Sequence, residues 1–132
     1  MGKKIRIAID AMGGDNSPNK IIEGIKISLK KNKECNFILY GQKDKINKEI
    51  EKNKEVKDFC EVHDVVDFIQ DDESPLSAAK RGKESSMWKS IESQKKNKSD
   101  ITLSAGNTGA LLVMSRLILN TIEGINKPAL AG

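Results

Sequence analysis

The chain has 132 residues, of which 37% are apolar, 32% are charged and only 4% are aromatic, and its formal net charge is +4. This length allows one domain, or part of one, with a real hydrophobic core, and the composition argues against disorder and against a membrane-spanning protein. The basic residues favour acidic partners in general, but they lack the interleaved aromatic residues that nucleic-acid binding requires. Because no apolar signal segment precedes the first predicted strand, we expect a cytoplasmic protein.

The first predicted element is a strand over residues 4–11, where KIRIAIDA alternates basic and apolar side chains before it becomes fully apolar. Ser17 and Pro18 then offer a helix cap and a first helical residue, and isoleucine or leucine recurs at every fourth position after them. This spacing predicts a helix from about 18 to 31.

The rest of the chain keeps alternating between strand and helix. Strands are predicted at 36–41, 59–64 and 101–105, and helices at 43–54, from Ser74 to about residue 92, and along the face formed by Leu111, Met114, Ile118 and Ile122. Parallel neighbours in a sheet need such crossover helices. The sequence therefore predicts an α/β fold with a parallel sheet, and this class binds its ligands at the carboxyl ends of the strands.

The loop after the first strand, DAMGGDNSP, joins glycines to carboxylates just before a helix. Gly13 and Gly14 can adopt positive φ and allow a ligand or another backbone to approach closely. Asp10 and Asp15 offer carboxylates. A plain turn of the chain is the alternative interpretation of these glycines.

The loop after the fourth predicted strand, SAGNTG, lies at the start of the last predicted helix. The amides of residues 107–109 have no partner within such a helix, and its dipole attracts negative charge. Ser104, Asn107 and Thr108 add side-chain donors, although Asn107 is equally a typical cap. We predict that this loop holds phosphate or a developing oxyanion. Neither a Walker loop nor GxGxxG is present, so no motif indicates nucleotide binding.

A third group of polar residues has weaker support. His63, the only histidine, falls near a predicted strand end, and Lys83, Ser85 and Ser86 fall within the following predicted helix. A lone histidine more often packs or lies on the surface than catalyses, and two serines in a helix are unremarkable.

Metal binding is not expected from this sequence. The adjacent carboxylates at 71–73 diverge in direction and are typical of a solvated turn. Cys35 and Cys60 lie far apart at the edges of apolar segments, so core packing is favoured over a disulfide or a metal site.

The segments IAIDAMGGD, VH, ESP, KESSM, SAGNTGA and GINKPALA follow one another along nearly the whole chain. In this order they resemble the N-terminal part of the bacterial phosphate acyltransferases of phospholipid synthesis, the PlsX family, and AMGGD and SAGNTGA are the most specific. The resemblance implies transfer of a fatty acyl group from acyl carrier protein to inorganic phosphate, giving acyl phosphate, with no metal or nucleotide cofactor. It also implies a three-layer α/β/α fold similar to isocitrate dehydrogenases and phosphotransacetylases, a homodimer, and peripheral association with the membrane.

The resemblance also assigns site residues. The predicted catalytic residues are His63, Lys83 and Asn107, and the predicted substrate-binding residues are Gly13, Gly14, Asp15, Ser85, Ser86, Ser104, Gly106, Thr108 and Gly109. The segment AAKRGKESS differs from the family pattern at two positions: the family usually has arginine in place of Lys80 and lysine in place of Gly82. Loss of a guanidinium fork would weaken bidentate contacts to phosphate, if that arginine makes them.

The family continues for more than a hundred residues after KPALAG, so residues 1–132 are predicted to be the N-terminal portion of the acyltransferase domain, with an incomplete sheet. One alternative is an inactive remnant that binds an anion or acyl phosphate, and another is one half of a split enzyme. A phosphotransacetylase for small acyl groups is disfavoured by AMGGD together with SAGNTGA. We expect the isolated chain to self-associate through exposed apolar surface and to be inactive alone.

Overall fold

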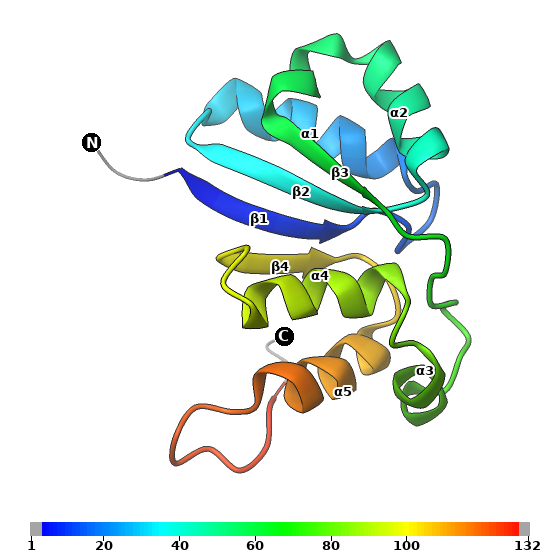
Figure 1. Cartoon of the computed structure of the whole chain (residues 1–132), viewed down its shortest axis with the longest axis vertical. Coiled ribbons are helices and arrows are strands. Elements are labelled where there is room, and N and C mark those ends of the chain that lie inside the picture. The colour runs from blue at the N-terminus through cyan, green and yellow to red at the C-terminus, as the bar shows by residue number, and fades with distance from the viewer. Residues whose placement is uncertain (1–3, 130–132) are drawn as a thin grey trace.

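A computed structural model describes residues 4–129 as one parallel sheet with helices on both faces (Figure 1). The strand order is β3-β2-β1-β4, and every pairing is parallel. The elements in chain order are β1 (Ile5–Asp10), α1 (Asn19–Lys31), β2 (Cys35–Gly41), α2 (Lys43–Lys52), the 3₁₀ helix η1 (Lys54–Phe59), β3 (Cys60–Asp64), α3 (Pro75–Arg81), α4 (Ser86–Lys95), β4 (Ile101–Ser104) and α5 (Thr108–Leu119). The predicted α/β class, with a parallel sheet between helical layers, is confirmed.

The chain winds away from β1 in two directions. From β1 it passes through α1 to β2 and through α2 to β3, and then α3 and α4 carry it back across the sheet to β4 on the other side of β1. Since parallel crossovers are right-handed, this reversal places α1 and α2 on one face and α4 on the other, as Figure 1 shows. The junction between β1 and β4 is therefore the topological switch point of the sheet, where α/β proteins bind ligands.

The main hydrophobic core lies between the sheet and the α1–α2 layer. Ile9, Phe37 and Leu39 alternate along β1 and β2 toward this side, where they meet Ile22 of α1 and Ile46 of α2. Full burial of a side chain of this size stabilises a fold by about 1.5–3 kcal/mol. The four-residue spacing that predicted α1 thus marks the face that packs on the sheet.

Both cysteines belong to this core region as free thiols, which confirms the packing interpretation. Cys35 is a buried member of the core and Cys60 packs against it. Burial raises the pKa of the Cys60 thiol to about 12. Thiolate chemistry at neutral pH is accordingly disfavoured at this residue.

The single helix predicted from Ser74 to about residue 92 is wrong, because the structure has two helices there. The predicted start is confirmed: the Ser74 hydroxyl accepts a hydrogen bond from the amide of Ser77, and Pro75 follows as the first helical residue. The break comes at Gly82, where a Cβ would lie only 2.5 Å from the carbonyl oxygen of Ala78. The chain then restarts as α4, which places the serine pair at the beginning of a helix rather than within one.

Three smaller expectations at helix and strand ends are also corrected. Ser17 does not cap α1; its hydroxyl donates to the carbonyl of Gly13, and the helix begins at Asn19. The last helix ends at Leu119, so Ile122 lies beyond it and is 81% exposed. The third strand starts one residue later than predicted because η1 occupies the residues before it.

Within residues 4–129, none of the helices combines the length and the apolar character that a bilayer span requires. The last two residues of the GINKPALA segment quoted above, Leu130 and Ala131, lie outside the described residues.

We predict that Gly82→Ala lowers the free energy of unfolding by about 1–3 kcal/mol, the usual cost of overpacking a filled interior. The new methyl group would meet the carbonyl of Ala78 and also the side chains of Ile69 and Met114. Urea unfolding followed by the fluorescence of Trp88 measures the change. The matched control is Gly24→Ala in α1, where a Cβ meets no atom within 4 Å and a gain of up to about 1 kcal/mol is expected from helix propensity. Equal stability of both variants would contradict close packing around Gly82.

Candidate functional site

The two glycine-bearing loops predicted to carry function lie in direct contact at the switch point. A Cβ on Gly13 would stand 2.9 Å from the amide nitrogen of Gly106, and one on Gly14, whose φ is +85°, would stand 2.9 Å from the carbonyl oxygen of Ala105. Only glycine allows backbones to approach this closely. These glycines therefore do more than turn the chain, because they let one loop pack against the other.

Asp10, the last residue of β1, joins these loops to α4. It is 2% exposed, and its Oδ2 accepts a hydrogen bond from the Ser104 hydroxyl at 2.8 Å. Its Oδ1 accepts from the Ser86 hydroxyl at 2.6 Å and from the amide of Met12 at 3.2 Å. The Ser104 oxygen in turn accepts from the amide of Gly106 at 3.1 Å. One buried carboxylate thus orders both loops.

The environment of Asp10 suits a buried negative charge. The carboxylate lies at the N-terminus of α4, where the helix dipole favours an anion, and the bonds to it are of the strong, charge-assisted kind. Sequence reasoning noted Asp10 as a carboxylate of the loop but did not place it among the site residues. The available signal was an aspartate that follows the apolar end of a strand in a predicted parallel sheet.

A row of polar and aromatic side chains that includes Asp10 crosses the sheet. In the strand registers His63 pairs with Tyr40, Tyr40 with Asp10, and Asp10 with Ser104. Partners in register point to the same face, which is the face that α4 covers. Three of the sequence segments named above therefore contribute a side chain to the same row across the sheet: VH, IAIDAMGGD and SAGNTGA.

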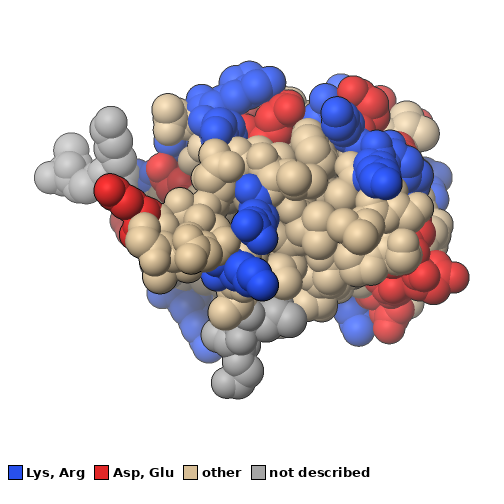
Figure 2. All heavy atoms as spheres, turned by 90° about the horizontal axis from the view of Figure 1, so that it is seen from below, with Lys and Arg blue, Asp and Glu red and all other residues tan. Residues whose placement is uncertain are grey.

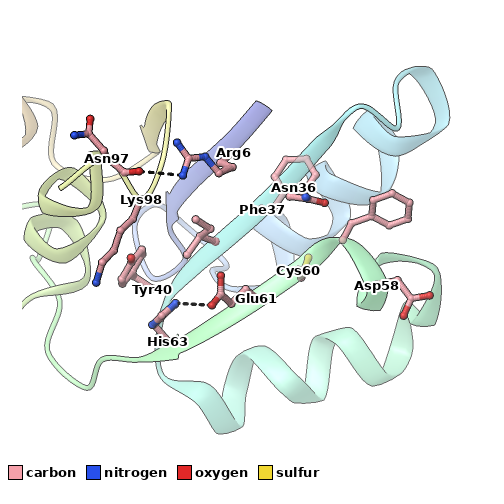
Figure 3. A pocket seen from close by; sticks show the side chains of 12 residues that line it. Arg6, Asn36, Phe37, Tyr40, Asp58, Cys60, Glu61, His63, Asn97 and Lys98 are labelled. Atoms are coloured by element: carbon pink, nitrogen blue, oxygen red, sulfur yellow. Dashed lines mark hydrogen bonds and ion pairs between the residues drawn. The ribbon is translucent and has the colours of Figure 1, made fainter. Parts of the chain in front are cut away.

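His63 lies at the far end of this row, away from the loops. Its ring stacks on Tyr40 with centroids 5.0 Å apart, and its Nε2 lies 3.3 Å from a carboxylate oxygen of Glu61. Figure 3 shows these side chains in an open hollow of 640 Å³ on β2 and β3. Strands are spaced by about 4.8 Å, so two spacings separate His63 from Asp10 by about 10 Å. Its catalytic role stays a prediction.

The residues of the KESSM segment take three different positions. Ser86 donates to Asp10 as described, whereas Ser85 caps α4 by accepting from the amide of Trp88 and donates to the carbonyl of Gly82. Both serines are fully buried. Lys83 is exposed in the turn between α3 and α4. In this arrangement the serine hydroxyls hold the backbone in place, and Lys83 is the member of the segment that solvent reaches.

Asn107 links the SAGNTG loop to the segment before α3. Its Oδ1 accepts from the amide of Ala110, which confirms it as the cap of α5. Its Nδ2 donates to the carbonyl oxygens of Gln70 at 3.1 Å and Glu73 at 2.8 Å, and it lies 3.4 Å from that of Asp71. Both ends of the amide are engaged, and the side chain is 9% exposed.

Arg81 holds the same segment from α3, and sequence reasoning missed it. Its guanidinium donates to the carboxylates of Glu73 and Asp67 and to the carbonyl oxygen of Phe68. The pairing keeps the pKa of Glu73 below its usual value, because the hydrogen bond stabilises the charged form. The acidic turn at 71–73 is tied to arginine and asparagine, and no cluster able to hold a metal occurs within residues 4–129.

The surroundings of the loops differ in charge. A hollow of 430 Å³ beside Gly14 is lined in part by the carboxylates of Asp15, Asp71 and Asp72. On the other side, Lys20 of α1 borders Ser104 and Ala105 in a groove of 340 Å³. The loops are therefore bordered by negative charge beside Gly14 and by one lysine on the α1 side.

At the start of α5, Thr108 is exposed, and the amides of the first helical turn have no partner within the helix. Gly109 packs on α3, since a Cβ there would lie 2.5 Å from Cγ of Pro75. Solvent therefore reaches the predicted phosphate or oxyanion position beside Thr108, whereas Pro75 limits the space beside Gly109.

We predict that Asp10→Ala lowers the free energy of unfolding by roughly 3 kcal/mol, because it leaves buried hydroxyl and amide donors without an acceptor. Hydrogen exchange of the amides in 12–14 and 104–107 should accelerate together, since both loops depend on the same carboxylate. Asp15→Ala, in the same loop but exposed, is the control and should change neither quantity. Unchanged exchange at 104–107 in Asp10→Ala would show that the loops are held by other contacts.

Comparison with known proteins gives consistent matches over almost the whole chain. A family model described as "Fatty acid synthesis protein" matches residues 5–132. A phosphate acyltransferase of Pelagibacter ubique is 51% identical over 131 residues, one of Afipia carboxidovorans is 42% identical over 132, and one of Rhodospirillum rubrum is 35% identical over 131.

Each of these matches covers 99% of this chain but only 39%, 37% and 38% of the respective relative. The chain therefore spans about two fifths of the length of the curated relatives it matches.

Proposed function

The chain belongs to the fatty acid synthesis protein family, and from this membership we propose that it forms part of a phosphate acyltransferase. In the proposed reaction a fatty acyl group passes from acyl carrier protein to inorganic phosphate, and acyl phosphate is released for phospholipid synthesis. The observation that carries the proposal is the contact of the AMGGD and SAGNTG loops at the switch point, held by one buried carboxylate.

The loops offer part of what this chemistry needs. An oxygen of phosphate attacks the thioester carbonyl, a new carbon–oxygen bond forms, and the carbonyl oxygen becomes an oxyanion. The carbonyl double bond then re-forms as the carbon–sulfur bond breaks, and the carrier leaves as a thiol that has taken up the proton lost by the phosphate. The amides of Thr108 and Gly109, which have no partner within α5, and the hydroxyl of Thr108 are suited to bind either the phosphate or the oxyanion.

The proposal extends to partners. A net charge of +4 suits an acidic carrier protein and a weak, peripheral contact with an anionic membrane. Homodimer formation by the complete enzyme belongs to the same proposal. Because the chain spans about two fifths of its relatives, we propose that catalysis needs the remaining part of the enzyme as well.

The proposal is tested by an assay of thiol release from acyl carrier protein, with and without phosphate. Residues 1–132 alone are expected to release no thiol and to self-associate in sedimentation, because Ile101, Leu103 and Leu117 expose apolar surface. Addition of the remaining part of the Pelagibacter relative is expected to restore phosphate-dependent release. A compact monomer that is active alone would contradict the need for a second part. Phosphate binding without any thiol release in the combined sample would instead favour the non-catalytic alternative.

The role of His63 is tested separately in the combined enzyme. If its imidazole donates a proton or polarises the substrate, His63→Gln should lower turnover by about 10²–10⁴-fold, the usual contribution of a positioned acid or base. The melting temperature should stay unchanged, because the side chain is exposed on an edge strand. Tyr40→Phe, which keeps the ring under His63 but removes a hydroxyl, is the control for the stacked pair. Normal turnover with a lower melting temperature would show that His63 has a packing role.

A further inference from the structure

The positive charge of the chain is concentrated in one stretch of the sequence. Residues 26–57 hold ten lysines against five acidic residues, whereas the rest of the chain holds 13 basic against 14 acidic residues. This stretch forms the end of α1, β2, α2 and the start of η1, and Figure 1 shows α1 and α2 together on one face of the sheet. The net charge of +4 therefore belongs to the α1–α2 layer and not to the surface as a whole.

The opposite end of the molecule has a different surface. Figure 2 views the molecule from the α5 end and shows a broad area in which few lysine or arginine side chains lie among uncharged residues. Beside Gly14, the carboxylates of Asp15, Asp71 and Asp72 add negative charge near the candidate site. An acidic macromolecule that approaches this chain is thus attracted toward the α1–α2 layer.

Three lysines of α2 form a stripe on the outside of this layer. Lys45, Lys48 and Lys52 follow one another at spacings of three and four residues, which places them on one face of the helix. The stripe runs for about 10 Å along the helix axis. Ile46 and Ile50, on the other face, are buried in the core. All three lysines are exposed, so this lysine stripe faces solvent.

The charges of the lysine stripe are only partly compensated. Lys52 pairs with Glu49 of the same helix at 3.4 Å, and its side chain is 70% exposed. The ammonium groups of Lys45 and Lys48 have no hydrogen-bond or ion-pair partner in the described part of the chain. An exposed ion pair contributes little to stability. Two ammonium groups are therefore available to a binding partner, and the third can exchange its partner at low cost.

The lysine stripe borders the candidate site. α2 starts directly after β2, at the carboxyl edge of the sheet where the two glycine-bearing loops lie. The amide of Lys43 donates to Asp64 at 3.0 Å, which fixes α2 to the end of β3. The side chain of Asn19 donates to Glu49 at 2.9 Å, which fixes α2 to the start of α1. A hollow of 400 Å³ separates the stripe from Pro18, which follows the first loop.

We propose that the lysine stripe is the docking surface for an acidic helix of acyl carrier protein. The inference rests on the proposed function, because that function supplies the carrier as the partner. Carboxylates on one face of the partner helix pair with Lys45 and Lys48, and the complementary charges select the partner and speed its approach. Docking beside the loops raises the local concentration of the acyl group, which the carrier holds on a flexible arm.

An anionic membrane fits the lysine stripe less well than a protein does. A helix that lies on a bilayer inserts apolar side chains, but Ile46 and Ile50 of α2 are buried in the core. Asp44 and Glu51 are exposed on the same helix and would meet the anionic head groups as well. A protein partner can place a basic side chain opposite such a carboxylate, whereas a surface of uniform negative charge repels it.

The docking surface is tested by the binding of acyl carrier protein to residues 1–132 and to the combined enzyme, without phosphate, so that no turnover is needed. Lys45→Glu together with Lys48→Glu should weaken binding by about tenfold or more, and binding of the unchanged chain should weaken as salt is added. Lys45→Arg with Lys48→Arg should preserve it. The control is Lys95→Glu with Lys127→Glu, which changes the net charge equally at exposed lysines outside α2 and should leave the affinity nearly unchanged.

Kinetics in the combined enzyme separate docking from chemistry. Lys45→Glu with Lys48→Glu should raise KM for the acylated carrier at unchanged kcat, and turnover of the same acyl group on a small thiol should not change. Failure of every substrate to release thiol would contradict the proposed reaction and leave the docking surface standing, because binding is measured without it.

Four outcomes would overturn the docking surface. They are no binding of the carrier by either sample, full binding by the Lys45 and Lys48 variant, an equal loss in the control variant, and binding of vesicles of anionic lipid through the stripe in place of the carrier. Melting temperatures of all variants are compared first, and they should be equal because each substituted lysine is exposed.

Discussion

The buried carboxylate of Asp10 is the contact on which the arrangement of the loops depends. It receives hydrogen bonds from the hydroxyls of Ser86 and Ser104 and from the amide of Met12, so β1, β4 and the start of α4 share one acceptor. A buried negative charge is costly unless it is fully hydrogen-bonded. The hydrogen bonds that Asp10 needs from Met12 and Ser104 therefore hold AMGGD and SAGNTG together. Gly13 allows the two backbones to touch.

A second set of bonds fixes the segment between β3 and α3 against these loops. Asn107 reaches it from the start of α5, and Arg81 reaches it from the end of α3. The segment has little regular structure of its own, so its shape depends on side chains from elsewhere in the chain. The N-terminus of α5 is consequently held on two sides, by Asp10 through Ser104 and by the carbonyl groups around Glu73.

The apolar surface is distributed unevenly between the two edges of the sheet. Near β3 the exposed row is polar and aromatic, with His63 stacked on Tyr40 and paired with Glu61, as Figure 3 shows. Near β4 the exposed side chains are Ile101 and Leu103, next to the apolar outer face of α5. Exposed apolar surface is thus concentrated at the β4 edge, which is also the edge beside the candidate site.

The sequence by itself determined the α/β class, the order of the strands along the chain, and the caps at Ser74 and Asn107, because these follow from local periodicity and from side chains that bond within three residues. The family followed from the order of short segments. Only the tertiary structure decided that residue 82 has no room for a side chain, since the atoms that a Cβ would meet there include those of Ile69 and Met114. It also decided the roles of Asp10 and Arg81, because their partners lie on other elements and no local pattern records such contacts.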